Sequence, residues 1–291
     1  MNRTWLILDC NYLCHRAKHA TGNLSYNSAA TGVAYGFLRE VLRLMDEFQT
    51  QYIVFCWDYG LGKRIHMYKE YKQQRRAKKE EFTPAEEQFE IEFQKQMTML
   101  RTKYLPAIGF RNIFYQQGYE SDDIIAMVCK EVEYKNDKGI IISSDKDLYQ
   151  LLRGGFRSVH MHNPQTRKTM TADRFKKEYR IAPSVWAMIK AIAGCSTDNV
   201  KGVTGVGEIT AIKYVKNELK KESKAFQNIA QAQSGGLIRR NLKLVRLPLD
   251  GTEPIRLKKD RLSRKGWSKV TTKLGFKSIK DRFPMPKGLK K

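Results

Sequence analysis

The sequence lacks the marks of a membrane protein, a disulfide-bonded protein or a zinc protein. No stretch is long and apolar enough to cross a bilayer, and nothing resembles a signal peptide. The five cysteines are scattered without a CxxC pair, and the five histidines lack metal-ligand spacing, so zinc is not expected. Reduced thiols of this kind fit a cytoplasmic location.

Acidic residues are scarce relative to basic ones. The chain of 291 residues has 54 lysines and arginines against 30 aspartates and glutamates, a formal charge of +24. Such an excess implies a polyanionic partner, most simply a nucleic acid; a basic membrane-surface protein is the alternative. With 41% hydrophobic residues the chain should be globular, as one large domain or a core with a second lobe.

Three apolar runs each end in an aspartate. They cover residues 5–9, 52–58 and 140–145, and their β-branched and aromatic side chains predict strands buried on both faces. Open α/β sheets bind ligands at the carboxyl ends of their strands. We therefore expect Asp9, Asp58 and Asp145 to converge. Because like charges repel, such a cluster requires cations to neutralise it.

Further acidic residues follow close to these predicted strand ends. Glu120 and Asp123 can share one face of a helix that begins there, with Asp122 turned away, while Asp147 follows Asp145 and Asp198 lies farther on. Carboxylates favour Mg²⁺ or Mn²⁺, and two such ions can clamp a phosphate without a nucleophilic side chain. The alternative is that these residues only cap helices and turns. The metal hypothesis requires that lysine and arginine do not already neutralise them.

The rest of the chain predicts alternating strands and helices. A helix is expected over 32–48. The charged stretch 63–81 has no convincing apolar face. Thr83 and Glu86 then form a capping box for a helix. That helix should bury one apolar stripe, formed by Phe89, Phe93, Met97, Leu100 and Tyr104.

The last third of the chain has a different pattern. Helices are expected over 183–193 and 208–219, with a glycine-spaced loop at 202–207 between them. The tail 252–291 has a net charge of +11, from 14 basic and 3 acidic side chains.

Eight segments in this order resemble the flap endonuclease family, which includes the 5′-nucleases of bacteriophages and the 5′–3′ exonuclease domain of bacterial DNA polymerase I. The matching segments are residues 7–17, 31–38, 55–64, 67–75, 118–126, 142–152, 193–211 and 239–248. The resemblance implies an α/β fold: a PIN-like 5′-nuclease core with a central, mostly parallel sheet, a helical arch and a helix-hairpin-helix region. The core would be 1–180, with its arch at about 59–100, and 181–291 would hold the DNA-binding region and the basic tail.

The resemblance also implies a divalent-metal-dependent flap endonuclease and 5′–3′ exonuclease that removes flaps or RNA primers in DNA replication, with RNase H activity as an extension. Asp9, Asp58, Glu120 and Asp122 would hold a first Mg²⁺ or Mn²⁺ ion. Asp145, Asp147 and Asp198 would hold a second, with Asp123 close by. Lys72 and Arg75 match arch positions that reach the scissile phosphate, where fixed cations stabilise developing charge. A solvated charged segment is the alternative for that stretch.

Several other positions would contact DNA with 5′ flaps, nicks or ends, or RNA–DNA hybrids. His15 stands where the family places a stacking aromatic residue, although it could be an ordinary surface residue, and Arg16 matches a phosphate contact. In the glycine loop, backbone amides can approach phosphates. The resemblance implies that a K⁺ ion can bind carbonyls of this loop. The expected DNA contacts are His15, Arg16, Lys63, Arg64, Lys190, Lys201, Gly202, Gly205, Gly207 and Lys213.

One position departs from the family pattern. Cys195 stands where the family commonly has a second aspartate, three residues before Asp198. A thiol is a poor ligand for Mg²⁺, so we expect a weakened second metal site. This leaves open a branched-DNA-binding protein with weak or lost nuclease activity; a PIN-type ribonuclease fits the length and the arch less well. The tail would bind DNA or dock onto replication proteins, in a bacterial or phage-infected cell.

Overall fold

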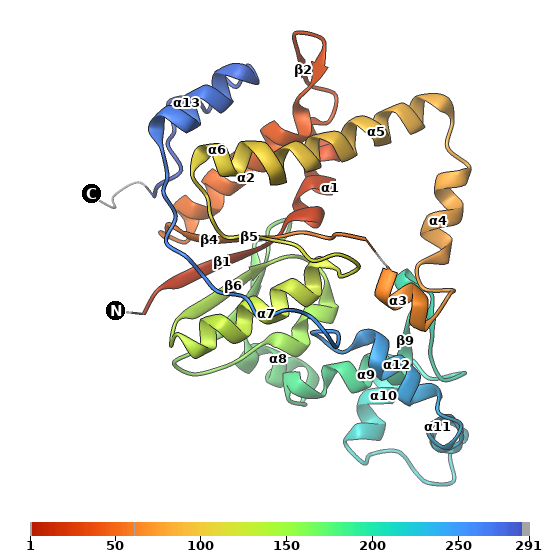
Figure 1. The fold of residues 1–291 in the computed structure, drawn as a ribbon. Helices are drawn as coiled ribbons and strands as arrows, with labels where there is room; N and C mark the ends of the chain where they lie inside the picture. Colours follow the sequence, from red (N-terminus) through yellow and green to blue (C-terminus); the bar gives the residue numbers. More distant parts are fainter. Residues whose placement is uncertain (1, 61, 287–291) are drawn as a thin grey trace.

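A six-stranded sheet forms the centre of the molecule, as the computed structural model of residues 2–60 and 62–286 shows (Figure 1). The strand order is β5-β4-β1-β6-β7-β8, and every neighbouring pair is parallel except β7 and β8. The predicted α/β fold with a mostly parallel sheet is confirmed. The strands are β1 (Thr4–Asp9), β4 (Tyr52–Cys56), β5 (Ile113–Phe114), β6 (Lys138–Ile142), β7 (Val159–Asn163) and β8 (Lys168–Met170).

Alternating side chains of the central strands enter two hydrophobic cores. Trp5 and Ile7 of β1 face one core, whereas Leu6 and Leu8 face the other. Because both faces are covered, the strands are apolar along their whole length, which is why these runs could be recognised in the sequence.

Helices cover both faces of the sheet. One face packs against α1 (Cys10–Thr21), α2 (Gly32–Glu47), α5 (Pro84–Met99), α6 (Leu105–Ile108) and α13 (Arg264–Lys273). The other face packs against α7 (Ser121–Tyr134) and α8 (Ala172–Tyr179). The described residues contain no helix that is both long and apolar enough to cross a membrane.

An arch of helices leaves the sheet after β4 and returns to it before β5. It comprises α3 (Gly62–Met67), α4 (Gln73–Glu80) and α5, which continues through a π-helical turn (Leu100–Tyr104) into α6 (Figure 1). The predicted capping box of Thr83 and Glu86 is present. The prediction of a buried Phe89 was wrong, since this side chain is 37% exposed at the solvent-facing end of α5, whereas Phe93 is buried.

A smaller helical region follows β8. It contains α9 (Trp186–Ala193), the short strands β9 (Gly194–Cys195) and β10 (Val200–Lys201), α10 (Glu208–Val215), α11 (Lys224–Ser234) and α12 (Leu237–Val245). The helix predicted over 208–219 ends at Val215, because the backbone turns at Lys216 and Asn217 adopts a positive φ of 59°. A short hairpin of β2 (Ser25–Tyr26) and β3 (Ala29–Ala30) lies between α1 and α2.

The tail returns to the sheet after this smaller helical region. Residues 252–263 run along the core, and Trp267 of α13 is buried against it. The approach is close at Gly109, where a Cβ would lie 1.9 Å from the carbonyl oxygen of Arg261.

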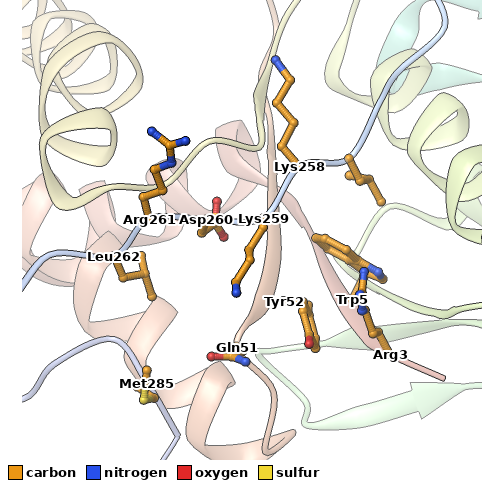
Figure 2. A pocket seen from close by; sticks show the side chains of 11 residues that line it. Arg3, Trp5, Gln51, Tyr52, Lys258, Lys259, Asp260, Arg261, Leu262 and Met285 are labelled. Atoms are coloured by element: carbon orange, nitrogen blue, oxygen red, sulfur yellow. The ribbon is translucent and has the colours of Figure 1, made fainter. Parts of the chain in front are cut away.

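A cavity of about 400 Å³ lies between the tail and the starts of β1 and β4 (Figure 2). Trp5 and Tyr52 form one wall, and Lys259 points into the space between Tyr52 and Leu262. Because this cavity is at the amino ends of the strands, it lies at the opposite edge of the sheet from Asp9 and Asp58.

Candidate metal centre and nucleic-acid interface

Asp9 and Asp58 lie at the carboxyl ends of the neighbouring parallel strands β1 and β4. Asp9 caps α1 by accepting from the Tyr12 amide at 3.1 Å, and it accepts from the Ser143 hydroxyl at 2.9 Å. Asp58 accepts from the Ser121 amide at 2.6 Å. The start of α7 is thereby fastened beside both strand ends, so its acidic first turn faces the same place.

Asp9, Asp58, Glu120 and Asp122 form a first group of carboxylates, and their negative charges repel one another. Burial, together with the charges of Asp58 and Asp145, raises the pKa of Asp9 to about 7. Burial, with the charges of Asp145 and Asp9, also raises the pKa of Asp122 well above its usual range. Burial and the charge of Glu120 raise the pKa of Asp58. Mutual repulsion of this kind marks carboxylates that a cation would hold together.

Glu120 is the point where the arch contacts this group. It forms an ion pair with Lys72 and accepts from the Tyr71 hydroxyl at 2.7 Å. Burial alone would raise the pKa of Glu120, but Lys72 and Arg64 outweigh burial and lower it. Lys72 adopts a left-handed backbone conformation with φ of 51°, and its amide donates to the Asp198 carbonyl at 2.9 Å. The arch is thus joined to both sides of the acidic site.

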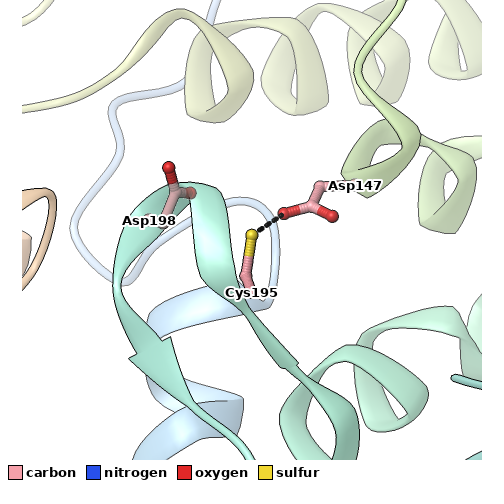
Figure 3. A group of neighbouring side chains, drawn as sticks. All are labelled: Asp147, Cys195 and Asp198. Carbon is pink, nitrogen blue, oxygen red and sulfur yellow. Dashed lines mark hydrogen bonds between the residues drawn. The ribbon is translucent and has the colours of Figure 1, made fainter. Parts of the chain in front are cut away.

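The second group lies just beyond the ends of β6 and β9. One ligand atom from each of Asp147, Cys195 and Asp198 lies within 4.8 Å of the others (Figure 3). Lys190 of α9 pairs with Asp147 at 3.1 Å. Burial and the charge of Asp145 raise the pKa of Asp147 to about 6, against the lowering effect of Lys190. Asp198 accepts from Arg75 at 3.2 Å.

The metal hypothesis requires that lysine and arginine do not already neutralise the acidic residues, and four of the acidic residues meet this requirement. Within residues 2–60 and 62–286, no ion pair joins a lysine or arginine to Asp9, Asp58, Asp122 or Asp145. The other acids have cationic partners: Glu120 pairs with Lys72 and Arg64, Asp147 with Lys190, and Asp198 with Arg75 and Lys72.

Two of the predicted site residues belong to the protein's structural core. Arg64 is 2% exposed and Asp123 is fully buried, and their side chains form two hydrogen bonds of 2.6 and 2.8 Å. Asp123 also accepts from the amides of Glu120 and Leu249. The predictions of Asp123 as a metal ligand and of Arg64 as a DNA contact were therefore wrong. The carboxylate of Asp123 and the guanidinium of Arg64 bind each other in the core and are not available to a metal ion or to DNA.

Removing this pair should cost much of the protein's stability. We expect Arg64→Met to lower the free energy of unfolding by about 3–5 kcal/mol, because it leaves the buried Asp123 carboxylate unpaired. Lys63→Met, at the exposed neighbouring position, should change it by at most ~0.5 kcal/mol. Urea unfolding measures both. A loss below about 1 kcal/mol for Arg64→Met would contradict the structural role.

Lys190 also differs from its prediction. Its side chain is 10% exposed and pairs with Asp147 and Glu208, so it neutralises the second acidic group instead of presenting a free cation to DNA.

The remaining predicted DNA contacts are less enclosed. Lys63, Lys201 and Lys213 are exposed. Arg16 is half-buried and pairs with Glu40, while the exposed His15 lies with its ring centroid 4.8 Å from that of Phe93.

The glycine loop contains two kinds of glycine. At Gly202 a Cβ would lie 2.2 Å from the Ala193 carbonyl oxygen, so this glycine permits close packing. Gly205 has a positive φ of 75°, and a Cβ there or at Gly207 would meet nothing within 4 Å. The outer part of the loop is therefore open, as a backbone approached by phosphates must be.

Sequence reasoning missed several residues that shape the site. Asn11 accepts from the Asp58 amide at 3.0 Å, and Arg101 donates to the Asp58 carbonyl at 3.2 Å. A cavity of about 280 Å³ adjoins Asp58 between β4 and α5. The polar residues Ser121 and Ser143 precede acids in the sequence, which was the one available signal for them.

The donor sets of the two groups differ. Asp9, Asp58, Glu120 and Asp122 supply only oxygen atoms, which fits Mg²⁺ or Mn²⁺. The second group supplies carboxylates from Asp147 and Asp198 with the Cys195 thiol between them, and this fits Mg²⁺ poorly.

The raised pKa values predict how metal stabilises the protein at different pH. Asp9 and Asp147 hold protons in the folded protein above their usual pKa of 3.8, so the titration of these two groups destabilises the folded protein as pH rises from about 4 to 7. Metal ions bind the deprotonated acids. We therefore expect the increase in Tm from saturating Mn²⁺, relative to chelator, to grow between pH 5 and 7.5.

Subtracting the Tm in chelator from the Tm in Mn²⁺ cancels the effect of groups that titrate equally in both conditions. Partial burial of the rings lowers the pKa of His15, His160 and His162, which would make the protein more stable as pH rises, but it does so with and without metal. Asp9→Asn should flatten the metal-dependent increase. An increase in Tm that is the same at pH 5 and 7.5 would exclude the acidic groups as its source.

Comparison with known proteins agrees with this geometry. Residues 4–180 match the family described as 5′–3′ exonuclease, N-terminal resolvase-like domain. The chain is 30% identical over 275 residues to a 5′–3′ exonuclease of Aquifex aeolicus, covering 90% of this chain and 89% of that protein. Its fold is similar to a structure of the phage T5 5′-exonuclease with bound zinc (TM-score 0.71, 24% identity, 84% and 90% of the chains). A T5 flap endonuclease complex with DNA and metal ions has TM-score 0.70 at 22% identity, over the same shares of the two chains.

Proposed function

Since this chain belongs to the 5′–3′ exonuclease family, whose members are metal-dependent nucleases, we propose that it hydrolyses phosphodiester bonds near 5′ ends and junctions of DNA, as flap endonuclease and exonuclease. The observation that supports this most strongly is that Asp9, Asp58 and Asp145 follow three parallel strands and that the charges of Asp58 and Asp145 act on Asp9. Lys72 of the arch pairs with Glu120 of the same acidic site. The chain's strong positive charge supports a nucleic acid substrate.

The residues divide the work of the reaction. Asp9, Asp58, Glu120 and Asp122 would hold Mg²⁺ or Mn²⁺, and Asp145, Asp147 and Asp198 a second ion. Such ions, when bound, activate water and stabilise the leaving oxygen. Lys72 and Arg75 hold fixed positive charges at the rim of the acidic groups, where they can stabilise charge that develops on the phosphate. Tyr71 orients Glu120 through its hydroxyl.

The open surfaces provide the DNA contacts. The loop with Gly205 and Gly207, together with Lys201 and Lys213, would bind duplex phosphates, with K⁺ held by loop carbonyls. His15 and Arg16 of α1 and Lys63 of α3 would contact the 5′ end. The biological role would then be the removal of RNA primers during DNA replication, with RNase H activity on RNA–DNA hybrids. The protein would act in the cytoplasm of a bacterial or phage-infected cell.

A panel of substrates tests the proposal. The full chain is incubated with 5′-flap, nicked, single-stranded and RNA–DNA hybrid substrates, with Mg²⁺, Mn²⁺ or chelator. We expect metal-dependent cutting near the junction. Tight binding of the flap without cutting under any metal would replace the proposal by a branched-DNA-binding protein, which Cys195 and the Lys190–Asp147 pair favour. Cutting of RNA alone would also overturn it.

The tail is the part best placed to dock a replication protein. Its residues 257–262 line the cavity at the far edge of the sheet, so a partner there would leave the acidic site open.

A further inference from the structure

The second acidic group contains a sulfur ligand held in a defined position. Cys195 is the last residue of β9 and pairs with Val200 of β10. The residue is buried, with 7% of its surface exposed. The Sγ atom points toward Asp147 (Figure 3), to which the thiol donates at 3.8 Å, and lies 3.0 Å from the Thr197 hydroxyl. Asp198 is at the end of the next helical turn, so the sulfur lies beside both carboxylates.

The second group carries less negative charge than the first group, because it has fewer carboxylates. Lys190 contacts one oxygen of Asp147, Oδ1, at 3.1 Å, and the thiol contacts the other, Oδ2. The atoms that face a common ion are therefore carboxylate oxygens and one sulfur, next to a fixed positive charge. Mg²⁺ prefers an octahedron of oxygen atoms and several negative charges, whereas thiolates select softer ions.

We propose that the second metal site of this chain selects a thiophilic divalent ion of the zinc or cobalt class, bound by Asp147, Cys195 and Asp198, while the first site takes Mg²⁺ or Mn²⁺. When the metal–sulfur bond forms, the thiol releases its proton to solvent, and no other reactant is required. The inference deepens the proposed function, because it concerns the second ion of the same site.

Cobalt titration tests the inference directly. A cobalt–thiolate bond gives a near-ultraviolet charge-transfer absorption that carboxylates do not give. We expect the chelator-treated full chain to develop this absorption and to saturate it at one equivalent. Zinc should remove it, and a large excess of Mg²⁺ should not.

Variants assign the absorption to one sulfur. Cys195→Asp and Cys195→Ser should abolish it and weaken Co²⁺ binding at this site by about tenfold or more, while Cys195→Asp should strengthen Mg²⁺ binding measured by calorimetry. Cys129→Ala, at a buried cysteine of α7, should retain the absorption. Thermal melts confirm that each variant is folded.

The outcomes separate this inference from the proposed function. Absence of the absorption in the wild-type chain, its displacement by Mg²⁺, or its persistence in both Cys195 variants would overturn the thiophilic site even if flaps are cut normally. Saturating absorption without any nuclease activity would support the site and overturn the nuclease proposal.

Discussion

Asp145→Asn is expected to lower kcat on a 5′-flap substrate by at least ~100-fold and to leave DNA affinity equal or higher. Asp145 follows β6, and its charge acts on both acidic groups, since it raises the pKa of Asp9, Asp122, Asp147 and Asp198. Asparagine preserves the size of the side chain and removes the charge that holds a cation. Loss of one negative charge near the phosphates also reduces their repulsion.

Single-turnover cutting and filter binding measure the two effects separately. The matched control is Asp173→Asn, at an exposed aspartate in the first turn of α8, which should cut at the wild-type rate. If Asp145→Asn stayed within about threefold of the wild-type kcat, Asp145 would have no part in holding the metal.

Lys72→Ala should slow cutting by about 100-fold and weaken DNA binding only a few-fold. The Lys72 ammonium pairs with Glu120 and lies 3.8 Å from Asp198, so it sits at the boundary between the two acidic groups. Burial would lower its pKa, but the charges of Glu120 and Asp198 raise it, so Lys72 stays protonated at neutral pH. A fixed cation there favours the more highly charged transition state over the bound substrate.

The control lysine lies on the same arch. Lys79 is more than half exposed and pairs with Glu90, and Lys79→Ala should affect cutting less than twofold. Lys72→Arg keeps the charge and should recover part of the rate. A twofold effect or less of Lys72→Ala would remove Lys72 from the catalytic role.

The sequence by itself determined the three central strands of the sheet, the acidic residues that follow them and the start of α5. The runs ending at Asp9, Asp58 and Asp145 could be recognised because a strand buried on both faces must be apolar throughout. The capping box at Thr83 is equally local, since it involves residues three apart. Such features depend on neighbouring residues in the chain, and the structure contains them as predicted.

Only the tertiary structure decided what each charged residue does. Arg64 and Asp123 are 59 residues apart in the sequence and look like ordinary charged residues, yet they neutralise each other in the core. Lys190 meets Asp147, and Tyr71 meets Glu120, through the same kind of distant contact. The role of a charge depends on its burial and on the opposite charge beside it, and both are set by how the chain folds back on itself.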